Sequence, residues 1–106
     1  MQDLITINSV VSLNNKYRFI LFCHEHNEVC ISANIILQEY LKDNRNKLDV
    51  ELEIVDEMSD IVKFKRYKIQ GVPTLLILKD QRIVKRWLGE ISYEKLENTM
   101  QAVIKN

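Results

Sequence analysis

Hydrophobic positions along the chain first predict four strands. Two almost wholly apolar runs, Tyr17–Cys23 and Leu75–Leu78, are typical of strands that are buried on both faces of a sheet. The segment Val50–Val55 alternates between apolar and acidic residues and then turns apolar, which also predicts a strand. Arg82–Leu88 follows a tight turn at Asp80–Gln81, so it predicts a strand antiparallel to the preceding one, in a hairpin.

Helical spacing begins after the polar loop that follows Cys23. Asn27 is a good N-cap, and Glu28 in the first turn suits the helix dipole. Apolar positions then recur at intervals of one, three and four residues, which indicates one face of a helix. These positions are Val29, Cys30, Ala33, Ile36, Leu37, Tyr40 and Leu41. The polar run 43–46 is expected to end this helix.

Two further helices are predicted from capping residues. Ser59 is expected to cap a helix that runs to about Tyr67. Its inner face would carry Ile61, Val62 and Phe64. Ser92 is expected to cap a last amphipathic helix. Its apolar face would carry Leu96, Met100, Val103 and Ile104, and Gly89 breaks the strand before it.

The start of the chain predicts a short strand at Leu4–Ile7 and a short helix near Ser9–Leu13. The main elements are predicted in the order βαβαββα. With 106 residues the chain is long enough for one core, so we expect a single domain over residues 1–106.

Composition narrows the function classes. Fifteen basic and fifteen acidic side chains cancel, so net charge favours neither nucleic acid nor an anionic membrane as a partner. The basic clusters in 63–68 and 79–86 are interpreted as solvated faces. No apolar run reaches the length that spans a bilayer, and no signal peptide is seen, so a cytoplasmic location is expected. No cofactor is predicted, and the two cysteines are expected to be free thiols, redox groups or metal ligands rather than a structural disulfide.

The strongest motif is Gly71-Val72-Pro73-Thr74, which opens the hairpin, with Gly89-x-x-Ser92 after it. Together with the element order, it resembles the thioredoxin family over essentially the whole chain. The resemblance implies an α/β fold, a thioredoxin-like three-layer sandwich with a mixed central sheet flanked by helices. It also implies a cis peptide bond before Pro73. The backbone of Val72 would then face a groove in which a partner's extended chain pairs with it, as in strand addition.

The chain departs from the family where the family carries Cys-x-x-Cys. The corresponding residues are Asn27-Glu28-Val29-Cys30, so Cys30 matches the second cysteine and an asparagine stands at the nucleophilic position. Cys23 and His26 fall at or near two family aromatics, and Leu21 matches the family's buried acid. Since asparagine cannot attack sulfur, we do not expect ordinary dithiol catalysis.

Four interpretations of this loop stay open. Cys23 and Cys30 form a non-standard disulfide if their Cα atoms lie within about 7 Å. Alternatively, Cys30 alone accepts glutathione or a partner disulfide. A third interpretation treats the cysteines as small buried apolar residues. Zinc binding by both cysteines with His24 and His26 is disfavoured, because the usual ligand spacings are missing.

Two functional hypotheses follow. In the first, the protein performs atypical thiol-disulfide exchange in cell redox homeostasis, with Cys30 as the reactive thiol and Cys23 as the resolving thiol. Its partner would be a protein disulfide, with glutathione as a further candidate. His26, Asn27 and Glu28 would shape the pocket, and Val72-Pro73 would hold the partner's chain. In the second, the protein is a redox-inactive module that binds a protein partner in the same groove. Exposure of Cys30 separates the two.

Overall fold

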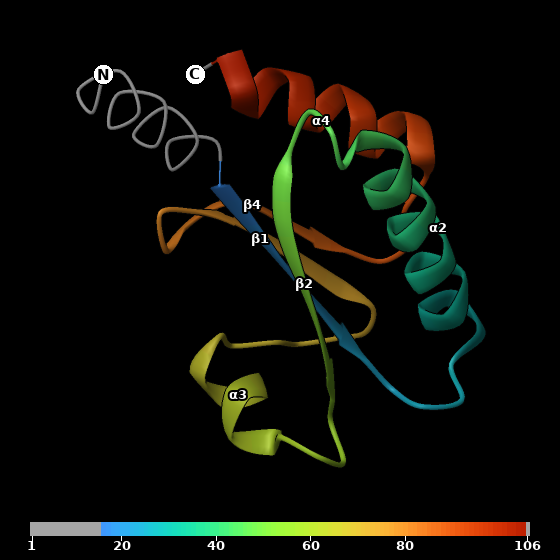
Figure 1. The fold of residues 1–106 in the computed structure, drawn as a ribbon. Coiled ribbons are helices and arrows are strands. Elements are labelled where there is room, and N and C mark those ends of the chain that lie inside the picture. Colours follow the sequence, from blue (N-terminus) through green and yellow to red (C-terminus); the bar gives the residue numbers. More distant parts are fainter. Residues whose placement is uncertain (1–15, 106) are drawn as a thin grey trace.

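The structure, a computed structural model, describes residues 16–105 and contains a mixed four-stranded sheet in the order β2-β1-β3-β4 (Figure 1). The strands are β1 (Lys16–Cys23), β2 (Asp49–Asp56), β3 (Thr74–Lys79) and β4 (Arg82–Leu88). β1 pairs in parallel with β2 and antiparallel with β3, and β3 and β4 form a hairpin. All four predicted strands and the mixed sheet are confirmed.

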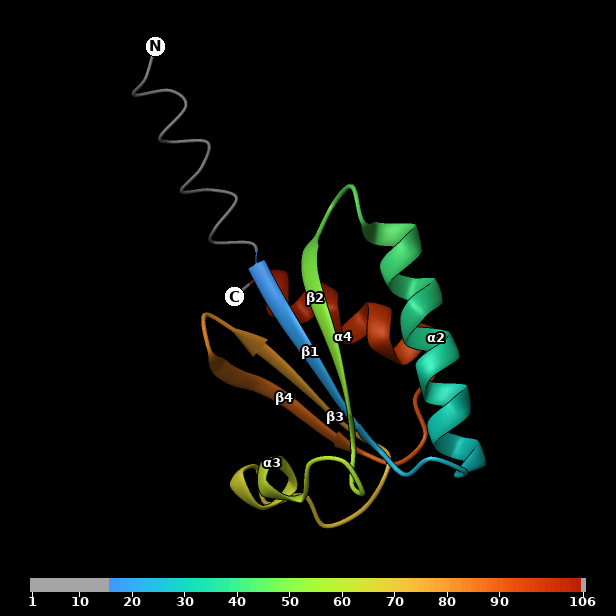
Figure 2. The same ribbon diagram turned by 60° about the horizontal axis from the view of Figure 1, so that its bottom comes forward.

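Helices cover both faces of this sheet and make three layers. α2 (Glu28–Asn44) and α4 (Tyr93–Lys105) lie on one face, and the short α3 (Ile61–Arg66) lies on the other (Figures 1 and 2). The predicted order βαβαββα and the three-layer α/β class are therefore confirmed. The predicted strand at Leu4–Ile7 and helix near Ser9–Leu13 lie outside the described residues.

The central strand β1 supplies both halves of the core. Phe19 and Leu21 are buried against α2 and α4, whereas Ile20 and Phe22 are buried with Phe64 of α3. Side chains alternate between the two faces of a strand, so only a wholly apolar run fills both layers. Each such side chain contributes about 1.5–3 kcal/mol through the apolar area that it removes from water.

Two of the three predicted helix caps are confirmed. The Asn27 Oδ1 atom accepts a hydrogen bond from the Cys30 N–H at 3.0 Å, and Ser92 Oγ accepts one from the Lys95 N–H at 3.1 Å. The prediction that Ser59 caps the next helix is wrong. The amides of Ser59 and Asp60 both donate to the Asp56 carbonyl, which extends the turn, so Asp60 becomes the cap.

Several predicted inner-face positions are exposed instead. These are Val29 in α2, Ile61 and Val62 in α3, and Ile104 in α4. α3 has only six residues, and Phe64 is its one buried side chain. Val29 lies in the first turn of α2, and Ile104 lies in the last turn of α4. A helical stripe therefore overestimates burial at helix ends.

The hairpin turn and the end of β4 depend on left-handed backbone. Asp80 and Gln81 have φ values of 52° and 68°, and positive φ at both central positions matches the twist of a two-residue hairpin. Gly89 ends β4 with φ of 104°, where a residue without Cβ is favoured. The predicted turn and strand break are confirmed. Within residues 16–105, no helix is long and apolar enough to cross a membrane.

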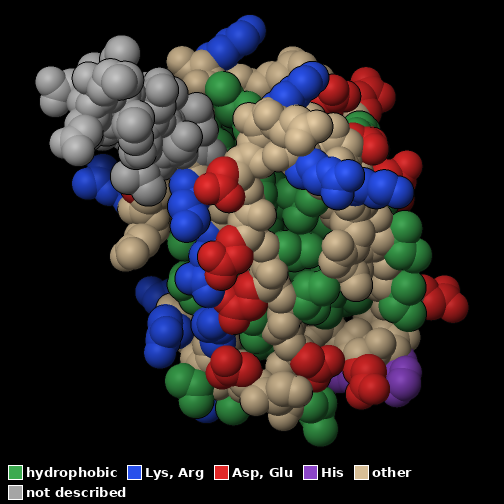
Figure 3. Space-filling view, in the orientation of Figure 1, with side chains coloured by type: hydrophobic (Ala, Val, Ile, Leu, Met, Phe, Trp, Pro, Cys, Tyr) green, Lys and Arg blue, Asp and Glu red, His purple; other side chains and the backbone are tan. Residues whose placement is uncertain are grey.

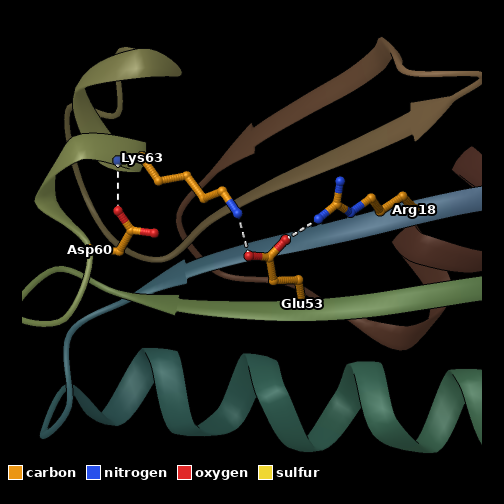
Figure 4. A network of polar contacts seen from close by, with 4 residues as sticks. All are labelled: Arg18, Glu53, Asp60 and Lys63. Atoms are coloured by element: carbon orange, nitrogen blue, oxygen red, sulfur yellow. Dashed lines mark hydrogen bonds and ion pairs between the residues drawn. The ribbon is translucent and has the colours of Figure 1, made fainter.

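An ion-pair network ties α3 to the sheet. The Glu53 carboxylate on β2 accepts hydrogen bonds from Arg18 on β1 and from Lys63 on α3 (Figure 4). The hydrogen bond from Lys63, supported by the charges of Lys63 and Arg18, lowers the pKa of Glu53 against the opposing effect of burial. The interpretation of Lys63 as part of a solvated basic face is wrong, because its side chain is only 19% exposed and pairs with Glu53.

Candidate functional site

Four loops meet at one end of the sheet, and we call this region the site end. It comprises loops 24–29, 56–60, 69–73 and 88–92. The strand register brings them together, because Cys23 lies opposite Asp56, while Thr74 lies between Phe22 and Leu88. In addition, the Glu57 N–H donates to the Cys23 carbonyl at 3.2 Å. Figure 2 shows the ends of β1 and β4 converging with the start of β3.

The first loop leads into the N-terminus of α2. The Asn27 N–H donates to the His24 carbonyl at 3.1 Å, which closes a turn, and the Asn27 side chain then caps the helix. Glu28 is exposed in the first turn, where its charge is favourable to the helix dipole. His26 is also exposed. At the position where the helix dipole would most stabilise a thiolate, the chain therefore presents an amide side chain.

The two cysteines lie next to each other beneath this loop. Cys30 is 2% exposed and Cys23 is 8% exposed, and both are free thiols. Burial first, and then the hydrogen bond with the Cys30 thiol, raise the pKa of Cys23 to about 12. The charges of Cys30 and Asp56 add to this increase. The His24 N–H points at the Cys30 Sγ atom at 3.4 Å. The site therefore contains a shielded dithiol rather than an exposed nucleophile.

The loop before β3 also lies at the site end. The Val72–Pro73 peptide bond is cis. The Pro73 carbonyl accepts a hydrogen bond from the Gly89 N–H at 2.8 Å, and the buried Thr74 hydroxyl donates to the Gly71 carbonyl at 2.7 Å. These bonds fix both sides of Val72. Among residues 16–105, neither the N–H nor the carbonyl of Val72 is hydrogen-bonded to another backbone group.

All the predicted site residues lie at the site end or directly beneath it. Cys23 and Cys30 are in contact, and Val72 packs against the hydrophobic cluster that contains both of them. In the described part of the chain, no three His, Cys, Asp or Glu side chains lie close enough together to hold a metal ion. The histidines and cysteines of the first loop thus do not form a zinc site in this arrangement.

Sequence reasoning missed three residues of the site end. Asp56 lies beside Cys23, while Met58 and Leu88 expose large apolar side chains. Leu88 follows from the hairpin, because a two-residue turn at Asp80–Gln81 places the end of β4 beside the start of β3. No sequence signal marks Asp56 or Met58, since parallel pairing of β2 with β1 brings them here from a distant segment.

Comparisons with known proteins identify the fold. No protein-family model matches the chain, and no curated protein sequence matches it. Among solved structures, the germline-specific thioredoxin Deadhead of Drosophila melanogaster is similar, with 18% identity and a TM-score of 0.71 over 92% of this chain and 90% of that one. The thioredoxin of Fasciola hepatica gives 20% identity and a TM-score of 0.72, over 95% and 91% of the two chains.

A mutant thioredoxin from Halobacterium salinarum NRC-1 is similar in the same way, with 18% identity and a TM-score of 0.72 over 91% of this chain and 80% of that one. At this level of identity the likeness concerns the fold. Sheet order, helix placement and these three structures agree, and the chain has the thioredoxin fold.

Proposed function

We propose that this protein is a thioredoxin-fold binding module that holds an extended segment of a protein partner against the Val72–Pro73 loop. The observation that carries the proposal is the contrast between the two thiols and the Val72 backbone. Both cysteines are shielded, whereas neither the N–H nor the carbonyl of Val72 pairs with another backbone group within residues 16–105. This arrangement supports binding better than it supports sulfur chemistry.

Burial argues against rapid dithiol exchange. Thiol–disulfide exchange requires a thiolate that a disulfide sulfur can approach in line. With a pKa of about 12, Cys23 is almost wholly protonated at neutral pH, and both side chains are covered by protein. The helix-start position that would supply an exposed thiolate is Asn27, whose side chain is occupied as the cap.

Backbone pairing supplies the affinity for such a segment. An extended segment that lies along Val72 satisfies the open N–H and carbonyl, in the manner of strand addition. The neighbouring bonds from Gly89 to Pro73 and from Thr74 to Gly71 hold the loop in place before binding. A fixed loop loses little conformational entropy on association, which favours the complex.

A second candidate function is slow thiol exchange, and the contact between the two thiols favours it. In that reaction Cys30 thiolate attacks a partner disulfide, forms a mixed disulfide and releases one partner thiolate. Cys23, as thiolate, then attacks the Cys30 sulfur, forms the Cys23–Cys30 bond and releases the second partner thiolate. The partner disulfide gains two electrons, and glutathione or another thiol must return them to the protein.

The binding proposal is tested by adding a neutral extended peptide, (Ser-Val)5, to isotopically labelled protein and following backbone amide resonances. We expect the Val72 amide to shift with the peptide and to stay unchanged with the same peptide N-methylated at alternate residues, which blocks backbone pairing. The response must persist in the Cys23→Ala, Cys30→Ala double variant. An unchanged Val72 resonance with the unmethylated peptide contradicts the proposal.

The second candidate is tested by intact mass after equilibration in glutathione buffers of increasing oxidation. Loss of two hydrogens, abolished by Cys30→Ser and by Cys23→Ser separately, would establish the internal disulfide and support exchange. A glutathione adduct that depends on Cys30 would instead indicate single-thiol chemistry. No mass change over the whole range would exclude both reactions and leave binding as the function.

A further inference from the structure

We propose that the site end selects a partner segment in which Lys or Arg side chains alternate with apolar ones. This inference rests on the proposed function, because it specifies the chemistry of the segment that the groove binds. Two features of the site end lead to it. They are a set of carboxylates without ion pairs and a set of exposed apolar side chains, both carried by the four segments of the site end.

Acidic residues predominate at the site end. Its four segments contain six Asp and Glu residues, and one basic residue, Lys68, lies in the same loop between α3 and β3, directly before Ile69. Asp56 and Asp60 accept hydrogen bonds from the backbone amides of Met58 and Lys63. The remaining carboxylates form no ion pair or side-chain hydrogen bond within residues 16–105. They are Glu25, Glu28, Glu57 and Glu90.

Large apolar side chains are exposed among these carboxylates. Met58 is 81% exposed, Leu88 is 66% exposed and Val29 is 43% exposed. Leu88 lies against the loop that leads to Val72, because a Cβ atom added at Gly71 would lie 3.0 Å from its Cδ1 atom. Figure 3 shows hydrophobic, acidic and histidine side chains along the lower edge of the molecule, in the orientation of Figure 1.

Backbone pairing with Val72 would let the carboxylates and the exposed apolar side chains select among partner segments by their side-chain pattern. In an extended segment, successive side chains point to opposite sides of the backbone. One set can therefore contact the apolar side chains such as Leu88, while the other set reaches the carboxylates. Complementary charge then speeds association and excludes acidic segments, which would be repelled by several unpaired carboxylates at once.

The acidic surface has a boundary on the α3 side. There Lys65 and Lys68, with Glu57 and Ile61, line a shallow hollow of about 290 Å³. Basic side chains of the partner are consequently expected over Glu25, Glu28 and Glu90 rather than over α3. The segment is therefore expected to bind with its cationic side facing the start of α2.

The test measures fluorescence anisotropy of a labelled (Lys-Val)5 peptide with the full chain, against (Glu-Val)5 and (Lys-Ser)5. We expect (Lys-Val)5 to bind most tightly and to weaken as salt rises, because rim charges are screened. Replacing two exposed carboxylates, Glu28→Gln with Glu90→Gln, should raise Kd roughly fivefold. The matched control, Glu39→Gln with Glu51→Gln, removes the same charge outside the site end and should leave Kd unchanged.

The outcomes separate this inference from the function on which it rests. Equal binding of (Lys-Val)5 and (Glu-Val)5, or equal losses in the test and control variants, overturns the charge selection alone. Equal binding of (Lys-Ser)5 and (Lys-Val)5 overturns the apolar component, which Leu88→Ser should also weaken. If none of these peptides binds and the neutral peptide leaves Val72 unchanged, the binding function itself is wrong.

Discussion

Replacing Asn27 with cysteine should give this protein the dithiol activity that its structure withholds. Asn27 occupies the N-cap of α2, three residues before Cys30, and its side chain is partly exposed. A thiol there would stand at the positive end of the helix dipole, where a thiolate is stabilised. Asn27→Ala is the matched control, because it removes the same cap without adding sulfur.

The magnitudes follow from the cap. Both variants lose the hydrogen bond from the Cys30 N–H to Asn27 Oδ1, at 3.0 Å. Loss of such a cap costs about 1 kcal/mol, which lowers Tm by about 4 °C for a chain of this size. Helix-dipole stabilisation is worth about 0.3–1 kcal/mol, so the pKa of the new thiol should be about 8. Roughly a tenth of it is then thiolate at pH 7.

The assay is the reduction of insulin disulfides by dithiothreitol, followed by turbidity. Asn27→Cys should accelerate the reaction above the unmodified protein, while Asn27→Ala should not. Adding Cys30→Ser to Asn27→Cys should abolish turnover and trap a mixed disulfide, because the resolving thiol is gone. If Asn27→Cys melts like Asn27→Ala but accelerates nothing, the missing sulfur does not limit exchange, and our reasoning from the helix start is refuted.

Three other predictions concern stability. Glu53→Gln should lower the free energy of unfolding by about 1 kcal/mol through loss of two partly buried ion pairs. The native protein should lose this contribution in urea titrations as pH falls through the depressed pKa of Glu53. Gly89→Ala should cost about 1–2 kcal/mol from its positive φ alone, since nothing lies within 4 Å of an added Cβ; an unchanged Tm contradicts this. Unfolding free energy should also decline between pH 9 and about 12, because the pKa of Cys23 is raised in the folded state. Cys23→Ala should make this decline smaller, and the raised pKa values of Tyr40 and Tyr93 account for the part that remains.

Local rules predicted the parts of the fold that local chemistry decides. The apolar runs of β1 and β3, the Asn27 and Ser92 caps and the turn at Asp80–Gln81 each depend on a few neighbouring residues. The start of α3 was misplaced because two residues compete as caps. Asp56 takes the amide of Ser59 into its turn, a choice that the composition of the segment does not reveal.

The sequence predicted which residues form the candidate site, but it did not predict their burial or their contacts. The sequence placed Cys23 and Cys30 near the same loop, yet their contact and burial depend on how β1 ends against α2 and β2. The unpaired carboxylates are also invisible in a neutral composition, because charge segregation appears only when four distant loops converge. The burial of the cysteines and the position of the carboxylates are therefore set by tertiary packing.

The central position of β1 also affects how the protein is made. β1 pairs on one edge with β2, from Lys16 opposite Asp49, and on the other with β3, from Tyr17 opposite Lys79. Both partners are synthesised later, so β1 leaves the ribosome with two open edges and two apolar faces. At 5–20 residues per second, roughly 3–10 s pass before β3 is complete. During that interval the strand exposes apolar surface and unpaired backbone, the two features that make a partly folded chain prone to aggregation.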